Sequence, residues 1–401
     1  MNTQFLKKLM VPAQTKIVLL IMDGLGGLPL ESGGKTELET ACTPNLDALA
    51  IRSALGLTMP AGPGITVGSG PGHLAIFGYD PIEYEIGRGA LEALGVDFEL
   101  GSDDVAARGN FCSVDENGFI TDRRAGRIPS DVSRELVSLL RTIKVAGVEF
   151  FVEIVKEHRF AFVMRAPGLR DALSGTDPLK VGVQTLPVRA LNREAKKAAQ
   201  YANQFIEQAR CLLADKHPAN MITLRGFAKL PCLPTYSELY GLHPAAIAIN
   251  GMYRGVARLA GMAVLQVCGD TIADEFSTLE KHWNDFDFFY MHIKKTDTFG
   301  EAGNFAGKVG VIEEVDALIP RLLALDPDVV IVGGDHSSPA VLKSHSWHPV
   351  PVLLYGKYVR EDRIPEFGER ACLRGSLGVL PAKHVIPIAL ANAGRVIKYG
   401  A

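Results

Sequence analysis

The sequence predicts an α/β protein in which helices flank a mostly parallel sheet and an α+β segment is inserted. One observation is a set of continuous apolar runs, typical of strands buried on both faces of a parallel sheet. These runs span residues 17–22, 286–291, 329–332 and 350–355. A second observation is that stretches with helical spacing lie between these runs. Strands that alternate with helices are typical of an α/β layer architecture. A third is the antiparallel pattern of residues 106–244.

Two stretches represent the predicted helices. "TPNLDALAIRSA" opens with Thr43 as a candidate N-cap and Pro44 at the first helical position, where the missing N–H of proline costs nothing. "GKVGVIEEVDALIPRLLAL", at 307–325, repeats apolar residues at helical spacing. Their places between apolar runs favour strands joined by helices.

The middle of the chain predicts an antiparallel α+β insertion. "ARGNFCSVDENGFITDRRAGRI" has a DENG turn between two apolar runs, a helix is predicted over 130–143, and "GVEFFVEIVKEHRFAFVMRA" alternates like a hairpin. A chain of 401 residues also exceeds the size at which one hydrophobic core usually stops growing. We therefore expect a core of residues 1–105 and 245–401 and an inserted domain of residues 106–244.

Charge and composition exclude several classes of partner. The net charge of −3 comes from 42 basic and 45 acidic residues, so no overall field favours nucleic acid or a membrane, whereas local charge still suits a small anionic substrate. The six cysteines are scattered without a CxxC pair, which favours reduced thiols and the cytoplasm. The stretch "MNTQFLKKLMVPAQTK" lacks a run of signal-peptide length and predicts a disordered lead-in or a short amphipathic turn. The longest early run, 17–22, is too short to span a bilayer.

Polar side chains follow the apolar runs, and ligands bind at the carboxyl ends of parallel strands. These side chains are Asp23, Asp297, Asp335 and His336, with His345 in the next loop. Three aspartates and two histidines suit manganese, magnesium or zinc. A single aspartate at a strand end is more often a helix cap or a turn former. The repetition of one pattern favours a metal site over that simpler interpretation.

A glycine-rich stretch supplies a candidate nucleophile. In "GPGITVGSGPGHLAIFGYDP", at 62–81, Ser69 stands between glycines just before a predicted helix, where backbone N–H groups favour an anion such as phosphate. The stretch is neither a Walker loop nor a GxSxG elbow. Taken alone, it fits a flexible loop with a capping serine better than a catalytic site.

Together these motifs resemble the alkaline phosphatase superfamily. The motifs are MDG at 22–24, GSGPGH at 68–73, TD at 296–297, GGDH at 333–336 and SHSWHPVPVLLY at 344–355. More closely, the chain resembles the archaeal-type cofactor-independent phosphoglycerate mutases, over residues 16–390. That likeness includes "YEIGRGALEALG", "DRRAGRI", "NGMYRGVARLAGM" and "HIKKTD". It implies an alkaline phosphatase-like core with an inserted substrate-binding lid domain.

The resemblance also implies a two-metal site and a phosphoserine intermediate. Two divalent ions would be bound, manganese first, with Mg²⁺, Co²⁺ or Zn²⁺ as alternatives. The implied ligands are Asp23, Ser69, Asp335 and His336 for one ion, and Asp297, Glu301 and His345 for the other. Ser69 would take the phosphoryl group and return it to the other hydroxyl of the glycerate, without 2,3-bisphosphoglycerate. Metal ions would activate the serine and clamp the transferring oxygens.

Two positions depart from the family pattern. Many members carry histidine where this chain has Glu301, four residues after Asp297. A carboxylate there favours manganese or magnesium, and a solvated loop residue is the simpler interpretation. In "GTDPLKVG", at 175–182, relatives tend to carry histidine at the position of Leu179, so no substrate role is carried over to that position.

A substrate with a phosphate and a carboxylate needs cationic partners, and arginine forks suit both groups. The candidates are Arg124 and Arg127 in "DRRAGRI", Arg225 in "LRGF" and Arg254 in "GMYRGVARL". Arg127 and Arg254 rank first because they resemble substrate-contacting cations of the family in placement. Surface arginines in weak salt bridges are the simpler interpretation. His73 is either a substrate or supporting contact or a histidine of the core.

The leading hypothesis is an isomerase of glycolysis and gluconeogenesis that interconverts 2- and 3-phosphoglycerate. The inserted domain would act as a lid, because a phosphoserine exposed to water would hydrolyse. A metal-dependent phosphatase or another phosphomutase of the superfamily is an alternative that the core motifs leave open. A non-catalytic metal-binding protein with a decayed site is the alternative of a different class. The resemblance also favours a homo-oligomer.

Overall fold

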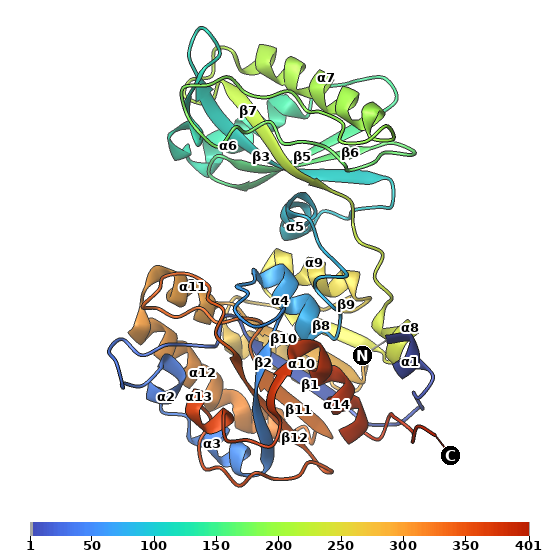
Figure 1. Cartoon of the computed structure of the whole chain (residues 1–401), viewed down its shortest axis with the longest axis vertical. Helices are drawn as coiled ribbons and strands as arrows, with labels where there is room; N and C mark the ends of the chain where they lie inside the picture. Colours follow the sequence, from blue (N-terminus) through green and yellow to red (C-terminus); the bar gives the residue numbers. More distant parts are fainter. Residues whose placement is uncertain (1–2, 401) are drawn as a thin grey trace. The chain divides into compact units, whose positions relative to one another are not determined.

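The computed structural model describes residues 3–400, and the chain forms two compact units. The first is made of Met1–Glu85 and Leu233–Ala401, and the second of Ile86–Cys232. Figure 1 shows the elements of both, coloured along the sequence. The second unit begins before residue 106 because helix α5 (Arg88–Gly95) packs against strand β3 (Asp104–Val114). Apolar periodicity does not indicate that contact.

The first unit is built on a mixed sheet, for which residues 3–400 supply eight strands in the order β13-β2-β12-β11-β1-β10-β8-β9. The strands are β1 Ile17–Met22, β2 Ser53–Met59, β8 Pro244–Ala248, β9 Ala263–Val264, β10 Phe288–Ile293, β11 Val329–Gly333, β12 Val350–Gly356 and β13 Gly378–Pro381. Strands β11, β1, β10 and β8 run parallel, whereas β12 is antiparallel to both neighbours. Every residue of β1 is buried, as in a strand covered on both faces. The prediction of an α/β protein with a mostly parallel sheet is confirmed.

Helices cover both faces of this sheet. Side chains alternate along β10, so Phe289 and Met291 join the core with residues of α10 and α12, whereas Phe288 contacts Tyr236 of α8 and Tyr290 contacts Phe77. The helices are α1 Thr3–Lys7, α2 Glu37–Thr40, α3 Pro44–Ile51, α4 Ser69–Ile76, α8 Tyr236–Tyr240, α9 Gly251–Leu259, α10 Ile272–Lys281, α11 Lys295–Ala302, α12 Phe305–Leu323, α13 Glu369–Cys372, η2 Ala382–His384 and α14 Val385–Asn392.

Several local expectations for the first unit can be compared with the structure. Helix α3 begins at Pro44 with Thr43 at its N-cap, but the Thr43 hydroxyl makes no capping bond and instead donates to Asp47. Within the N-terminal stretch, residues 3–7 form α1, and residues 1 and 2 lie outside the described part of the chain. The helix predicted over 307–325 is α12. Among the described residues, no helix combines the length and apolarity that a membrane crossing requires.

The second unit is an antiparallel α+β domain, as the middle of the sequence predicts. Strand β3 pairs with β4, β6 and β7, and the predicted hairpin is formed by β5 and β6. The remaining elements are β4 Ile120–Asp122, η1 Ala125–Arg127, α6 Ser130–Leu140, β5 Glu149–Lys156, β6 Arg159–Arg165, α7 Lys196–Leu213 and β7 Met221–Ala228. Residues of α6 and α7 pack with the sheet in one core. The unit therefore has a hydrophobic core of its own.

The loops that follow β1 and β11 lie against each other. Ser338 donates its N–H to the carbonyl oxygens of Gly24 and Gly26, at 3.2 and 3.0 Å. Gly24 has a φ of +63°, and a Cβ there would lie 2.7 Å from Ser338 Oγ, so only glycine fits. A Cβ on Gly72 of α4 would lie 2.6 Å from the carbonyl oxygen of Asp335. These glycines therefore let α4 and two loops meet at the carboxyl edge of the sheet.

Candidate active site

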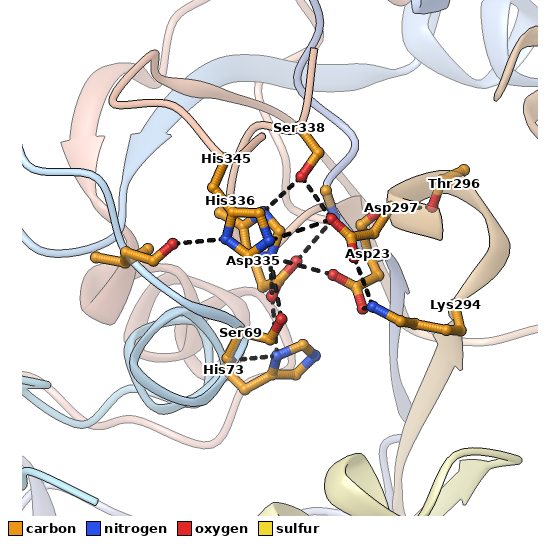
Figure 2. A network of polar contacts seen from close by, with 12 residues as sticks. Asp23, Ser69, His73, Lys294, Thr296, Asp297, Asp335, His336, Ser338 and His345 are labelled. Carbon is orange, nitrogen blue, oxygen red and sulfur yellow. Dashed lines mark hydrogen bonds and ion pairs between the residues drawn. The ribbon is translucent and has the colours of Figure 1, made fainter. Parts of the chain in front are cut away.

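Asp23 follows strand β1 and lies within the polar network drawn in Figure 2. Its carboxylate is fully buried, with Oδ1 3.3 Å from His336 Nε2 and Oδ2 2.9 Å from Lys294 Nζ. His292 Nε2 lies 3.3 Å from the same Oδ2. Burial would raise the pKa of Asp23, but the imidazoles of His292 and His336 and the Lys294 charge hold that pKa well below its usual value. Asp23 is therefore an ionised acceptor inside the first unit.

The loop after β11 carries Asp335 and His336, which approach Asp23 and Ser69. Asp335 Oδ1 accepts the N–H of Gly24 at 3.0 Å, and its Oδ2 lies 3.2 Å from His336 Nε2. Ser69 is the first residue of α4, and its Oγ also lies 3.2 Å from His336 Nε2. Ligand atoms of Asp23, Asp335 and His336 all lie within 4.8 Å of one another. The structure thus brings four of the sequence-predicted site residues together.

A second cluster adjoins the first through His336. Ligand atoms of Asp297, His336 and His345 lie within 4.8 Å of one another, and the rings of His336 and His345 stack with centroids 3.8 Å apart. His345 Nε2 lies 3.4 Å from Asp297 Oδ1 and 3.4 Å from Glu301 Oε1. The Nδ1 of His345 contacts the carbonyl oxygen of Val67 at 2.9 Å, which orients Nε2 toward the carboxylates. Glu301 has a side chain that is 57% exposed and lies at the rim of this cluster.

The expectation that Asp297 ends a strand is wrong. Strand β10 ends at Ile293, and Asp297 lies in the first turn of helix α11. Because α11 begins directly after the strand, the carboxylate still reaches the site, where Ser338 donates its hydroxyl to Oδ1 at 2.5 Å. Burial would raise the pKa of Asp297, but its contacts with His345 and Lys294 lower it.

Lys294 is a site residue that apolar periodicity does not indicate. Its Nζ donates to Asp23 Oδ2 at 2.9 Å and to Asp297 Oδ2 at 2.6 Å, so it links the two clusters, as Figure 2 shows. Burial would lower the pKa of Lys294, but the two carboxylates raise it above its usual value. The sequence does contain one signal for it: a lysine three residues before the aspartate of "HIKKTD", after an apolar run.

His73 lies behind the candidate ligands. Its side chain is fully buried, and its Nδ1 lies 2.8 Å from the carbonyl oxygen of Ser69 and 3.1 Å from Asp335 Oδ2. Burial would lower the pKa of His73, but the neighbouring carboxylate of Asp335 raises it. This geometry makes His73 a support for Asp335, and a contact with substrate stays a prediction.

The buried acceptors fit divalent metal ions. Within the described part of the chain, Asp23 Oδ1 and Asp335 Oδ2 are buried atoms without a hydrogen-bond partner. Buried carboxylate oxygens are costly unless a donor or a cation satisfies them. Carboxylate oxygens and imidazole nitrogens in two adjoining clusters form a donor set that suits manganese, magnesium or zinc. These residues could therefore hold two ions.

The predicted arginines separate into two places. Arg124, Arg127 and Arg225 line a cavity of about 370 Å³ within the second unit. Arg254 lies in α9 of the first unit, where its Nη1 donates to the carbonyl oxygen of Ile249 at 2.7 Å. Three further arginines line the same cavity: Arg108, Arg123 and Arg159. We call this the arginine cavity.

The arginine cavity concentrates positive charge. Arg108 of β3 lies directly opposite Arg225 of β7, although like charges opposite each other in a sheet are destabilising. Burial and the neighbouring arginines lower the pKa of Arg108 to about 10, against the opposing effect of Glu92. The carboxylate of Asp177 binds Arg123 through two hydrogen bonds, at 2.8 and 3.0 Å. The surplus of guanidinium groups suits an anion with more than one charge.

Comparison with known proteins agrees with the sequence motifs. A family model described as 2,3-bisphosphoglycerate-independent phosphoglycerate mutase matches residues 50–220. Two relatives, from Thermus thermophilus and Thermotoga neapolitana, are both described as "Probable 2,3-bisphosphoglycerate-independent phosphoglycerate mutase". The first is 49% identical over 99% of this chain and 98% of its own length, and the second is 50% identical over 99% of each.

Solved structures share the whole fold. The PH0037 protein from Pyrococcus horikoshii has a TM-score of 0.81 and 30% identity, covering 97% of this chain and 100% of that chain. The cofactor-independent phosphoglycerate mutase from Thermoplasma acidophilum has a TM-score of 0.78 and 29% identity, covering 95% and 100%.

The relatives are matched along nearly their full length, and the site lies at the sheet edge of a shared fold. This chain is therefore an isomerase of the phosphoglycerate mutase class. The chain belongs to the archaeal-type 2,3-bisphosphoglycerate-independent phosphoglycerate mutase family. The family resemblance drawn from the motifs is thereby confirmed.

Proposed function

We propose that this protein interconverts 2- and 3-phosphoglycerate through a phosphoserine at Ser69, without 2,3-bisphosphoglycerate. The observation that carries the proposal is the place of the Ser69 hydroxyl. It lies at the N-terminus of α4 and 3.2 Å from His336 Nε2, which itself contacts Asp23 and Asp335. A hydroxyl there adjoins both backbone N–H groups that favour phosphate and the candidate metal ligands. This position supports a nucleophile that takes and returns a phosphoryl group.

The transfer consists of two exchanges at phosphorus. In the first, Ser69 Oγ bonds to phosphorus while the bond to one glycerate oxygen breaks, and the serine proton ends on that oxygen. In the second, the other glycerate hydroxyl attacks the phosphoserine, and its proton ends on Ser69 Oγ. Each exchange makes and breaks one phosphate ester bond, so no external phosphoryl donor is consumed.

We assign the metal ligands as the family resemblance implies: Asp23, Ser69, Asp335 and His336 for one ion, and Asp297, Glu301 and His345 for the other. Divalent ions, manganese first, would stabilise the charge on the transferring oxygens when bound. The protein itself orients the carboxylates, because His73 contacts Asp335 and Ser338 donates to Asp297. Glu301 is the most exposed of the assigned ligands, so we expect its loss to have the smallest effect on metal affinity.

The arginine cavity supports recognition of an anionic substrate. A phosphoglycerate carries a phosphate and a carboxylate, and both are bound well by guanidinium forks. We propose that Arg124, Arg127 and Arg225 contact these groups, with Arg254 as a further contact from α9. The pairing of Arg108 with Arg225 across the sheet agrees with a bound anion that offsets their repulsion.

The remaining parts of the hypothesis stay predictions. The second unit is proposed to act as a lid that keeps water from the phosphoserine. A homo-oligomer and a place in glycolysis and gluconeogenesis in the cytoplasm are proposed as well. None of the cysteines within residues 3–400 forms a disulfide, which agrees with a reducing compartment.

A coupled assay tests the proposed function. The protein is supplied with 3-phosphoglycerate and Mn²⁺, without 2,3-bisphosphoglycerate, and both 2-phosphoglycerate and free phosphate are measured. We expect 2-phosphoglycerate with little phosphate, and no product from Ser69→Ala whose circular dichroism matches that of the wild type. Phosphate alone would identify a phosphatase on the same core, and neither product would contradict the assignment of phosphoglycerate as substrate.

A further inference from the structure

Lys308 of helix α12 is a buried cation in the interior of the first unit, and it touches none of the proposed ligands. Its side chain is fully buried, and its Nζ donates to the carbonyl oxygens of Gly24 at 2.8 Å, Gly26 at 3.1 Å and Ser338 at 3.0 Å. An ammonium group has three N–H donors, and all three are used. Gly24 and Gly26 belong to the loop after β1, whereas Ser338 belongs to the loop after β11. One side chain therefore joins two loops that lie far apart in the sequence.

Glu37 carries the nearest opposite charge. Its carboxylate accepts backbone N–H groups of the same two loops. Its Oε1 lies 4.0 Å from Lys308 Nζ and accepts the N–H of Ala340 at 2.7 Å. Its Oε2 accepts the N–H of Leu28 at 3.1 Å. Leu28 lies in the loop between β1 and α2, and Ala340 lies in the loop after β11. Carbonyl and amide groups of both loops are thus held by one buried pair of opposite charges.

Glu369 extends this arrangement. Its Oε1 accepts the N–H of Gly27 at 2.9 Å, and its Oε2 accepts the hydroxyl of Thr36 at 2.5 Å, next to Glu37. The side chains of Lys308 and Glu37 are fully buried, whereas Glu369 is half-buried. We call Lys308, Glu37 and Glu369 the Lys308 cluster. An apolar residue would fill the position of Lys308 without the cost of burying a charge, so a role in geometry explains the lysine better than a role in packing.

The loops joined by the Lys308 cluster carry the proposed ligands. Asp23 directly precedes Gly24, and His336 lies two residues before Ser338. The distance between Asp23 Oδ1 and His336 Nε2, 3.3 Å, therefore depends on how the two loops are spaced. A support of this kind orients ligands without touching metal or substrate.

We propose that Lys308 is a positioning residue that sets the spacing of Asp23 and His336 in the metal site. This inference rests on the proposed function, because it takes those residues as metal ligands. Loss of the ammonium would free three carbonyl groups and let the loops separate, and the affinity for metal would fall although every ligand is still present.

The test compares Lys308→Met with Arg395→Met, a matched loss of a buried cation elsewhere in the first unit. Arg395 donates to Thr15 and Asp287, near the amino end of β1 and away from the ligand loops. Mn²⁺ affinity is measured by calorimetry on protein whose fold is checked by circular dichroism. We expect Lys308→Met to bind Mn²⁺ about tenfold more weakly or worse, and Arg395→Met to keep the wild-type affinity while losing thermal stability.

Kinetics provide a second readout that a purely structural role would not move. In Lys308→Met, the Mn²⁺ concentration for half-maximal activity should rise, whereas KM for 3-phosphoglycerate at saturating Mn²⁺ should stay within about twofold of the wild type. Lys308→Gln, which keeps two N–H donors, should fall between wild type and Lys308→Met in Mn²⁺ affinity.

The outcomes separate this inference from the proposed function. Equal Mn²⁺ affinity in wild type, Lys308→Met and Arg395→Met would overturn the role of Lys308. Failure of both Lys308 variants to fold would also overturn it, because the lysine would then serve the fold as a whole. If the wild type itself bound no Mn²⁺, the proposed metal site would fail independently of Lys308.

Discussion

His73 Nδ1 lies 3.1 Å from Asp335 Oδ2, and both side chains are completely buried. Among the described residues, Asp335 Oδ2 makes no hydrogen bond of full geometry, and ring nitrogens of His73 and His336 lie 3.1 and 3.2 Å from it. His73, four residues after the proposed nucleophile, thus contacts a carboxylate in the loop after β11.

The first prediction concerns this contact. His73→Leu removes the ring nitrogen and fills its place with an apolar side chain. The carboxylate of Asp335 then loses the contact that orients it. We expect Mn²⁺ affinity to fall about tenfold or more, measured by calorimetry. His282→Leu, directly after α10, changes a half-buried histidine that pairs with Asp285 and should leave the affinity unchanged. Equal affinities in wild type and His73→Leu would refute the supporting role.

Removal of metal should reveal the role of Lys294. Its ammonium links the carboxylates of Asp23 and Asp297, so Lys294→Met leaves two buried anions close together. After chelation, we expect this variant to melt at a lower temperature than the wild type, and Mn²⁺ should raise its Tm by more than it raises that of the wild type. Lys295→Met replaces the exposed neighbour as a matched control. A metal-free Lys294→Met that melts with the wild type would contradict this account.

Loss of the predicted arginines should weaken substrate binding more than metal binding. Arg127→Gln and Arg254→Gln each remove a guanidinium fork, and a charged hydrogen bond contributes about 1.5–3 kcal/mol. We therefore expect KM for 3-phosphoglycerate to rise roughly tenfold to a hundredfold. The Mn²⁺ titration should be unchanged. Arg141→Ala, which removes an exposed ion pair with Glu153, is the control in the second unit. Unchanged kinetics in both Arg127→Gln and Arg254→Gln would place the substrate-binding cations elsewhere.

His158 should make stability depend on pH. Burial and the charge of Arg159 lower its pKa to about 4, below the value of about 6.5 in an unfolded chain. The folded protein therefore holds His158 neutral, and its stability contribution is full above about pH 6.5 and is lost as pH falls toward 4. The advantage of wild type over His158→Gln in thermal unfolding should shrink across that window, by up to about 3 kcal/mol in free energy. A difference that stays constant with pH would show that His158 does not titrate in this way.

Much of the fold is predictable because buried strands have a simple signature. The runs ending near Asp23 and Asp335 are continuous and apolar, so their strands and the shared carboxyl edge follow from the sequence. The position of Asp297 was harder to predict, because strand β10 ends at Ile293 and the next helix begins at Lys295. The sequence indicates that a polar residue follows a strand, but not whether it lies on a loop or in a helix.

Residues whose role depends on how helices pack or how strands pair could not be predicted in the same way. Lys308 stands in a helical pattern, where a lysine normally faces solvent, and only tertiary packing buries it. Arg108 and Arg225 face each other because of the register between β3 and β7, which no single strand encodes. Such residues become visible only when the pairing of elements is known.

Trapping of the intermediate tests the central claim most directly. Wild-type protein with Mn²⁺ is mixed with 3-phosphoglycerate and quenched in acid within a turnover, and its peptides are analysed by mass spectrometry. The account predicts a phosphoryl group on Ser69 in the wild type and none on Ser69→Ala. Mutase turnover without any phosphorylated Ser69, or with the phosphoryl group on another residue, would contradict it.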